Sequence, residues 1–192
     1  MFENKNRVHM EEKGAASLLA EIIYTYITSL NYHTRQEILI TCIGTDRSTG
    51  DSLGPLTGTL LQDENYLPAQ VIGCLDHPVH ASNLKEIISQ IEKDYLHPFI
   101  IAIDAGLGKQ NSVGYIDVKK GPLQPGTGVN KNLTEIGDMH ITGLVNIGGY
   151  MEYLVLQSTR LSLVMNMAGI ISRALKNSFL KLEKHENYKN RA

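Results

Sequence analysis

The sequence predicts an α/β protein, a three-layer α/β/α sandwich around a mostly parallel, twisted sheet. Two continuous apolar runs, Glu37–Ile43 and Phe99–Ile103, are typical of strands that are buried on both faces of a parallel sheet. Segments with apolar residues at helical spacing alternate with these runs along the chain. Such alternation indicates a sheet that carries helices on both of its faces.

The other elements follow from periodicity and from turn residues. Helices are predicted over Ala15–Leu30, Asp51–Asp63, Leu84–Tyr95, Leu144–Gln157 and Gly169–His185, and further strands over Gln70–Leu75, Val113–Lys119 and Arg160–Met165. Pro55 suits the first turn of its helix, where a missing N–H is tolerated. Asn83 and Glu86 have the spacing of a capping box at the start of the third helix.

The length of 192 residues predicts one domain, residues 1–192. The charged start lacks the apolar segment of a signal peptide, so residues 1–13 are expected to be a short flexible arm in a cytoplasmic protein. Residues 186–192 are expected to be a frayed tail. No apolar run approaches the ~20 residues of a membrane helix, so no membrane partner is expected.

Charge and cysteine usage exclude further classes. The net charge of −2 leaves no broad basic field, and the chain has no Trp, so we expect no nucleic-acid partner. Cys42 and Cys74 stand in apolar runs and are expected to be buried, reduced thiols. The chain has no C-x-x-C pair, so a zinc knuckle is not supported.

Two carboxylates follow the two buried strands. Asp51 comes after the first strand through the loop GTDRSTG, and Asp104 directly ends the second. The ligand crevice of an open α/β sheet lies at the carboxyl ends of its strands, so we expect the two acids to meet there. Two acids sharing a proton titrate far apart, and one can act as base while the other acts as acid. Asp51 could instead cap a helix, and Asp104 could bind loop amides.

Other polar residues leave alternatives open. Asp46 and Arg47 could pair with each other or touch substrate. His140 stands at the start of a predicted helical stretch, and a set of two Asp and one His could bind a metal. The glycine-rich loops lack the Lys-Ser/Thr ending of a P-loop, and no G-x-S-x-G elbow indicates a serine hydrolase.

Three ordered motifs between residues 37 and 145 resemble the germination protease family of spore-forming bacteria. TGDSLGP (49–55) resembles the family's T-P-D-x-L-G-P, IIAIDAGLG (100–108) its I-x-x-I-D-A-L-A, and QPGTGVN (124–130) its H-P-G-S-G-V-G. The resemblance implies a peptidase that cleaves small acid-soluble spore proteins in the forespore or spore core. It further implies Asp51 and Asp104 as the catalytic pair, with no cofactor.

The glycine-rich loops are expected to shape the substrate groove and to donate amides to a developing oxyanion. The residues expected to bind substrate are Gly44, Asp46, Gly54, Gly106, Gly126 and Gly128. The germination protease family is related in fold to the hydrogenase maturation endopeptidases. That relation implies an alternative in which Asp51, Asp104 and His140 bind nickel. A non-catalytic binding protein on the same fold and a homo-oligomer remain open.

Overall fold

The computed structural model describes residues 6–30, 32, 35, 37–63, 67–125 and 134–189. The strands are β1 (Arg7–His9), β2 (Ile38–Cys42), β3 (Gln70–Ile72), β4 (Phe99–Gly108), β5 (Tyr115–Lys120) and β6 (Met139–Ile147). The α-helices are α1 (Ala15–Ser29), α2 (Leu53–Gln62), α3 (Leu84–Asp94), α4 (Glu152–Gln157) and α5 (Leu161–Lys189). Two short 3-10 helices are η2 (Gly50–Ser52) and η3 (Gln110–Ser112).

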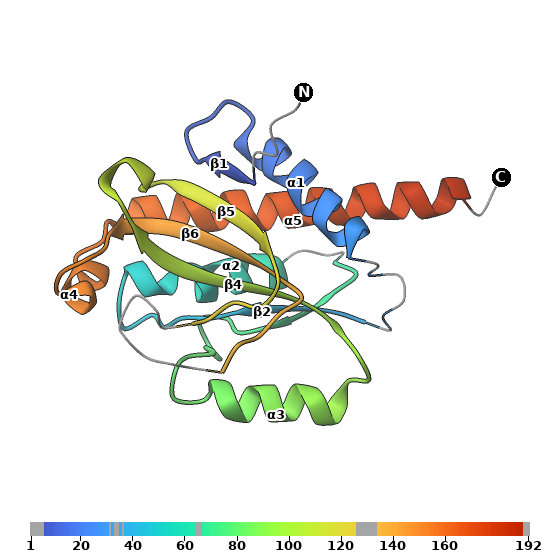
Figure 1. The fold of residues 1–192 in the computed structure, drawn as a ribbon, viewed down its shortest axis with the longest axis horizontal. Helices are drawn as coiled ribbons and strands as arrows, with labels where there is room; N and C mark the ends of the chain where they lie inside the picture. Colours follow the sequence, from blue (N-terminus) through green and yellow to red (C-terminus); the bar gives the residue numbers. More distant parts are fainter. Residues whose placement is uncertain are drawn as a thin grey trace.

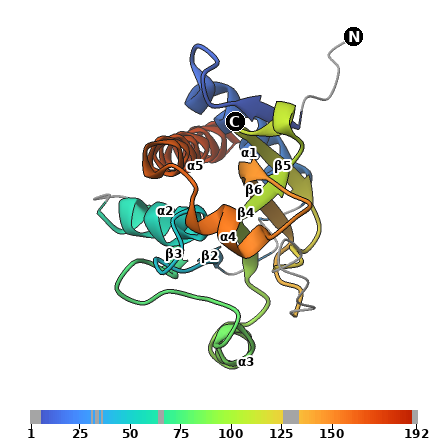
Figure 2. The ribbon, with the colours of Figure 1, turned by 90° about the vertical axis from the view of Figure 1, so that its left-hand side faces the viewer.

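These elements form the predicted α/β sandwich with a mostly parallel sheet (Figure 1). The six strands lie in the order β1-β5-β6-β4-β2-β3. β3, β2, β4 and β6 run parallel, and β5 and β1 are antiparallel to their neighbours. The carboxyl ends of the parallel strands therefore meet at one edge, the edge that faces the viewer in Figure 2.

The larger hydrophobic core lies between the sheet and the helices α1, α2 and α5. Leu19 and Ile23 of α1 and Ile171 of α5 are fully buried there against Ile103 of β4 and Ile141 of β6. Burial of each such side chain stabilises the fold by about 1.5–3 kcal/mol. This face fixes the strands and thereby positions the residues that follow them.

The opposite face of the sheet is covered only in part by the described helices. Leu84 and Ile91 of α3 pack against Leu39 of β2 and Ala102 of β4 in a smaller, separate core. α3 lies apart from the other helices, below the sheet in both ribbon views (Figures 1 and 2). Side chains of β5 and β6 that point to the same side as Ala102 line a cleft instead.

Two predicted elements near the C-terminus are wrong. The predicted helix over Leu144–Gln157 is strand β6 up to Ile147, and only its last part is α4. The strand β6 buries alternate residues, which is the two-residue period of a sheet. The predicted strand Arg160–Met165 lies almost entirely in α5, because Val164, Met167, Ala168 and Ile171 are buried together at helical spacing.

The chain ends also differ from the expected flexible segments. Within the predicted arm of residues 1–13, Arg7–His9 form the edge strand β1, which pairs antiparallel with β5. At the other end, the backbone of α5 continues to Lys189.

Of the predictions for single residues, those for Pro55 and the two cysteines are confirmed and the capping box is wrong. Pro55 lies in the first turn of α2, as predicted. The capping box is absent, because the Asn83 side chain accepts a hydrogen bond from the His80 amide and donates one to the Pro78 carbonyl. Cys42 and Cys74 are buried and free, as predicted, and burial raises the pKa of the Cys42 thiol.

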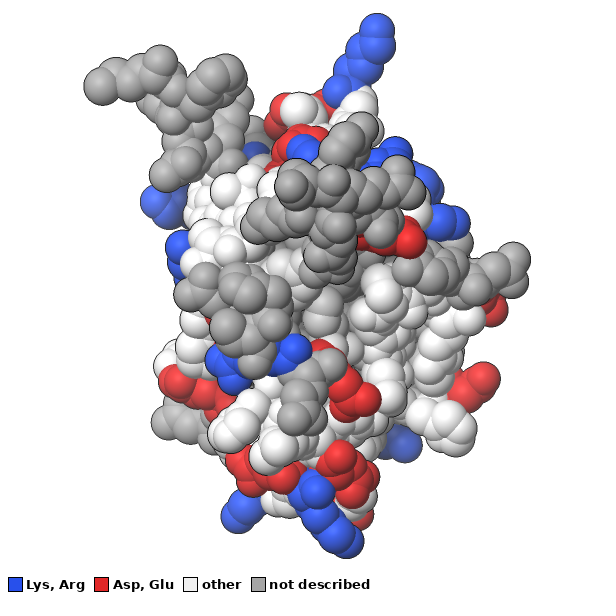
Figure 3. Space-filling view, turned by 90° about the vertical axis from the view of Figure 1, so that its right-hand side faces the viewer, with Lys and Arg blue, Asp and Glu red and all other residues white. Residues whose placement is uncertain are grey.

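The surface offers two plain observations. Among the described residues, no helix combines the length and apolar character needed to cross a bilayer. Acidic and basic side chains are interspersed on the face drawn in Figure 3, without a continuous field of one sign. This agrees with the small net charge of −2.

The junction between β2 and α2 generates the first testable prediction. A Cβ added at Gly54 would lie 2.0 Å from the Ile43 carbonyl oxygen, so Gly54→Ala must push α2 away from β2. We expect a loss of about 2–3 kcal/mol in the free energy of unfolding, measured by urea denaturation. The control is Gly169→Ala inside α5, which meets only the flexible end of Arg173 and should be neutral or stabilising by up to about 1 kcal/mol. Equal effects of the two changes would contradict the steric argument.

Candidate active site

Two glycines fold the loop after β2 back over the end of that strand. Gly44 has a φ of +141°, and a Cβ there would lie 1.9 Å from the Asp51 carbonyl oxygen. The next residue, Thr45, donates its amide to the same oxygen at 3.1 Å. Gly54 lets the start of α2 approach Ile43 equally closely. These contacts hold Asp51, in η2, beside the carboxyl end of β2.

Asp104 occupies the matching position on β4. The pairing of β2 with β4 runs to Cys42 opposite Ile103, and Asp104 is the next residue of β4. Its side chain is buried, with 7% of the residue exposed. One carboxylate oxygen, Oδ1, accepts a hydrogen bond of 2.8 Å from the Ala105 amide. Asp104 therefore does not end its strand as predicted: it lies inside β4, just past the last pair that β4 forms with β2. Asp51 lies in η2, beyond the end of β2.

The electrostatics of Asp104 are those of an acid that holds its proton. Burial raises its pKa well above the ordinary value, and the charge of Asp51 raises it further. The Ala105 amide lowers the pKa, but this effect is the smallest of the three. The two acids thus differ in environment, because Asp104 is buried and Asp51 is only partly buried.

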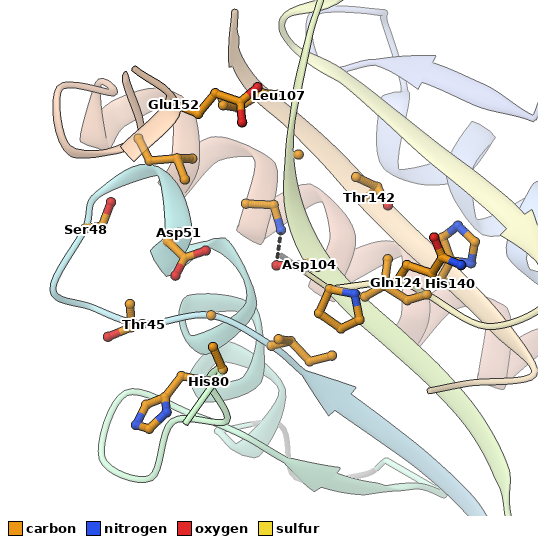
Figure 4. A pocket seen from close by; sticks show the side chains of 18 of the residues that line it. Thr45, Ser48, Asp51, His80, Asp104, Leu107, Gln124, His140, Thr142 and Glu152 are labelled. Carbon is orange, nitrogen blue, oxygen red and sulfur yellow. Dashed lines mark hydrogen bonds between the residues drawn. The ribbon is translucent and has the colours of Figure 1, made fainter. Parts of the chain in front are cut away.

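The sequence left two other roles open, helix capping for Asp51 and amide binding for Asp104. Asp51 is not at an N-cap position: it lies inside η2, whose N-cap residue is Thr49, and the N-cap residue of α2 is Ser52. Asp104 does bind a loop amide, that of its own neighbour Ala105. This bond fixes the carboxyl group and leaves it facing the cleft that Figure 4 shows.

Both acids line one cleft with a volume of about 960 Å³. Its walls come from the loop after β2, from the end of β4, from β5 and β6, and from α4. In Figure 4, Asp51 and Ser48 stand on one side, Asp104 lies in the middle, and Gln124 and His140 lie beyond it. The predicted substrate residues Gly44 and Gly106 also line this cleft.

Two of the other predicted substrate residues, Asp46 and Gly54, do not line the cleft. Asp46 is exposed and lies outside the cleft, while its neighbour Arg47 lines it. Gly54 is buried against Ile43, so its role is packing. Gly126 and Gly128 lie outside the described residues.

His140 lies in the cleft but not beside the two acids. It is on strand β6, not at the start of a helix, and pairs with Ala102, whereas Thr142 is the residue opposite Asp104. The Nδ1–H of His140 donates to the Gly121 carbonyl at 2.9 Å. Strand spacing separates the Cα atoms of His140 and Asp104 by roughly 8 Å.

The nickel alternative needs three ligands at one point. Among the residues that the structure describes, no three His, Cys, Asp or Glu side chains come together closely enough to hold a metal ion. Asp51, Asp104 and His140 thus share a cleft without forming a three-ligand group.

A row of polar residues crosses the sheet beside the acids, and the sequence analysis missed it. Arg7, Asp117, Thr142 and Asp104 are in register on four adjacent strands. Arg7 donates two hydrogen bonds to the Asp117 carboxylate, from Nε at 2.8 Å and from Nη2 at 2.9 Å. The signal was the alternation of polar and apolar residues on β5 and β6, which puts Asp117, Lys119, His140 and Thr142 on one face.

One polar group in the cleft wall lacks a partner. Ser48 lines the cleft and is 7% exposed, and its hydroxyl makes no hydrogen bond to any residue that the structure describes. A buried hydroxyl without a partner costs stability unless a bound molecule satisfies it. Ser48 is therefore a candidate contact for a ligand.

Comparison with known proteins identifies the family. The chain belongs to the family described as "Protein of unknown function (DUF1256)", whose model matches residues 7–174. It is 47% identical over 176 residues to "Uncharacterized protein YyaC" of Bacillus subtilis (strain 168), an alignment that covers 91% of this chain and 86% of the relative. The fold is also similar to a [NiFe] hydrogenase maturation protease HycI from Thermococcus kodakarensis KOD1, with a TM-score of 0.45, 14% identity, and coverage of 81% of this chain and 99% of that one.

The coupling of the two acids gives a prediction about titration. Asp51→Asn removes the negative charge that helps to keep Asp104 protonated, so the pKa of Asp104 should fall while remaining raised by burial. Carboxyl carbon chemical shifts followed by NMR from pH 3 to 9 measure this change. The matched control is Asp46→Asn in the same loop, which lies outside the cleft and should leave the pKa of Asp104 unchanged. An unchanged pKa in both variants would show that the acids do not interact.

The raised pKa of Asp104 also predicts how stability depends on pH. The folded protein keeps this proton over a range where the unfolded chain has lost it, so Asp104 lowers stability as the pH rises from about 4 through its folded pKa. Asp104→Asn should therefore unfold at higher urea than wild type at pH 7, with a smaller difference at pH 4.

A second aspartate on the same sheet face serves as the control. Asp117→Asn loses the ion pair with the half-exposed Arg7 and should be less stable at pH 7 by about 1 kcal/mol. An Asp104→Asn variant that loses stability at both pH values would contradict the assignment of a buried, protonated acid.

Proposed function

We propose that this member of the family is a peptidase that hydrolyses peptide bonds in another protein, with Asp51 and Asp104 as a proton-sharing catalytic pair. One observation carries the proposal: Asp104 has a pKa raised by burial and by Asp51, in a cleft that both side chains line. Perturbed acids in a cleft are typical of catalytic sites. A cleft of about 960 Å³ also has room for several residues of a polypeptide.

The chemistry assigns one role to each acid. Asp51, ionised, takes a proton from a water molecule whose oxygen attacks the peptide carbonyl carbon. Asp104, protonated, donates its proton to the carbonyl oxygen, and a tetrahedral diol forms. When the C–N bond breaks, the proton on Asp51 passes to the leaving amine and a diol proton returns to Asp104. The net reaction consumes one water, and the original protonation of both acids is restored.

For the substrate, we propose small acid-soluble spore proteins, cleaved in the forespore or spore core. The support is the resemblance of three ordered motifs to the germination protease family, TGDSLGP, IIAIDAGLG and QPGTGVN. The first two motifs carry the two acids, and the structure brings both acids to one cleft. A protein substrate extends beyond the bond that is cut, so an open cleft suits it better than a closed pocket would.

The experiment incubates purified protein with small acid-soluble spore proteins and measures fragments by mass spectrometry. Asp51→Asn and Asp104→Asn should each lower the cleavage rate by at least about 100-fold, because proton transfer in the transition state contributes that much. Asp46→Asn, the exposed acid of the same loop, should cleave as wild type does. The rate should also fall as the pH rises through the pKa of Asp104, because the acid then loses its proton.

Two outcomes would defeat the proposal. Cleavage at the wild-type rate by either Asn variant at the cleft would remove the acids from the mechanism. Absence of cleavage by wild type, with the fold intact by circular dichroism, would favour a non-catalytic binding protein on this fold.

A further inference from the structure

We infer that the substrate polypeptide binds in extended form and adds as a strand to the open edge of β4 at Ala105–Leu107, directly beside Asp104. The catalytic consequence of this arrangement rests on the proposed function, whereas the binding mode does not. The inference comes from the pairing of the sheet, from the direction of main-chain groups, and from the wall that faces them.

β4 is longer than the strand beside it. β2 pairs with β4 from Ile38 to Cys42, and the last bond runs from the Ile43 amide to the Ile103 carbonyl at 2.7 Å. The chain then turns away at Gly44, which has a φ of +141°. β4 continues to Gly108 and pairs there with β6 alone. In the described part of the chain, no strand lies against the other edge of Ala105–Leu107.

The main-chain groups at this edge point into the open space. In a strand, the N–H and C=O groups of one residue point to one side and those of the next residue point to the other. The Ile103 carbonyl points toward β2. The groups of Ala105 therefore face the same way. The pairing with β6 shifts between Gly106 and Leu107, but Gly108 faces β6, where its carbonyl accepts the Gly148 amide at 2.9 Å, so the groups of Leu107 also face away from β6. The Ala105 amide is bound by Asp104. In the described part of the chain, the Ala105 carbonyl and both main-chain groups of Leu107 have no strand to pair with on this side, so an added strand can pair with them.

The edge borders the cleft that holds the two acids. Ala105, Gly106 and Leu107 all line it. Unpaired strand edges bind other extended chains, and peptide-recognition proteins use this property. Because Ala105 follows Asp104 directly, a chain paired at this edge brings its own peptide bonds alongside the catalytic carboxyls.

The facing wall fits a polypeptide better than a small charged ligand. It includes Ser48, whose buried hydroxyl makes no hydrogen bond to the described residues. Tyr153, 62% exposed, and Leu156 of α4 also line the cleft and present apolar surface to the side chains of such a strand. In an extended chain every second side chain would face this wall. The occupant we infer is thus an extended segment with an apolar side chain near the bond to be cut.

The test measures binding without catalysis, on the full chain carrying Asp104→Asn. The probe is a peptide mixture made by Glu-C digestion of a bacterial lysate, and peptides retained by the immobilised protein are identified by mass spectrometry. A second protein adds Leu107→Pro, which removes the outward N–H and leaves the pairing with β6 intact. The matched control adds Leu107→Ala, which shortens the side chain and keeps the N–H. We expect retention to fall at least tenfold with proline and little with alanine.

A second measurement does not depend on the folding of the proline variant. The best-retained peptide is synthesised with single N-methyl groups at successive positions, and its affinity for the Asp104→Asn protein is measured by calorimetry. Strand addition predicts losses at alternate positions, because only every second amide of the peptide faces β4.

The two measurements together test whether a peptide adds as a strand to β4. A period-two loss together with the proline effect supports strand addition. Losses at no position, losses at every position, or no retained peptide at all would overturn it. The proposed function is judged separately: if wild type binds these peptides in the same way but cuts none of them, the peptidase assignment fails and the binding mode stands.

Discussion

The close approach of the start of α2 to the end of β2 is the constraint on which the site depends. Gly54 brings the helix onto the Ile43 carbonyl, and Gly44 brings the Asp51 carbonyl onto the strand end. Side chains at these two positions would separate the elements. Asp51 would then leave the edge of the sheet, and Asp104 would lose the neighbour whose charge helps to raise its pKa. Backbone packing between two apolar elements thus sets the electrostatics of the cleft.

The buried Asp104 lowers the free energy of unfolding at neutral pH, and the rest of the fold must offset this loss. A buried carboxyl with a raised pKa lowers stability at neutral pH, so the surrounding structure must hold it in place. The large core between the sheet and α1, α2 and α5 supplies this support. Perturbed acids of this kind, here inside a central strand, are more frequent at functional sites than elsewhere in proteins.

The sequence predicted the parts of the molecule whose patterns are local. The buried runs of β2 and β4 and the acids behind them were found because a continuous apolar stretch and its end are visible in a short window. The sequence predicts a helix from Leu144 onward, whereas the structure continues strand β6 to Ile147. His140 was therefore assigned to a helix start. Which residue stands opposite Asp104 depends on strand register, and register is set by pairing between distant segments.

The same limit explains the polar row that was missed. Arg7 lies in a segment expected to be a flexible arm, and its pairing with Asp117 brings together residues 110 positions apart. The open edge of β4 could not be predicted from the sequence either, because it exists only where β2 stops pairing with β4. The candidate pair, in contrast, needed only the rule that parallel strands end at one edge.

The unequal covering of the two sheet faces has a consequence for how this family can diversify. Residues of β5 and β6 that point toward the large core are locked by their packing, whereas Lys119, His140 and Thr142 on the other face border open space. Substitutions at these three positions would change the lining of the cleft and leave the residues of the large core in place.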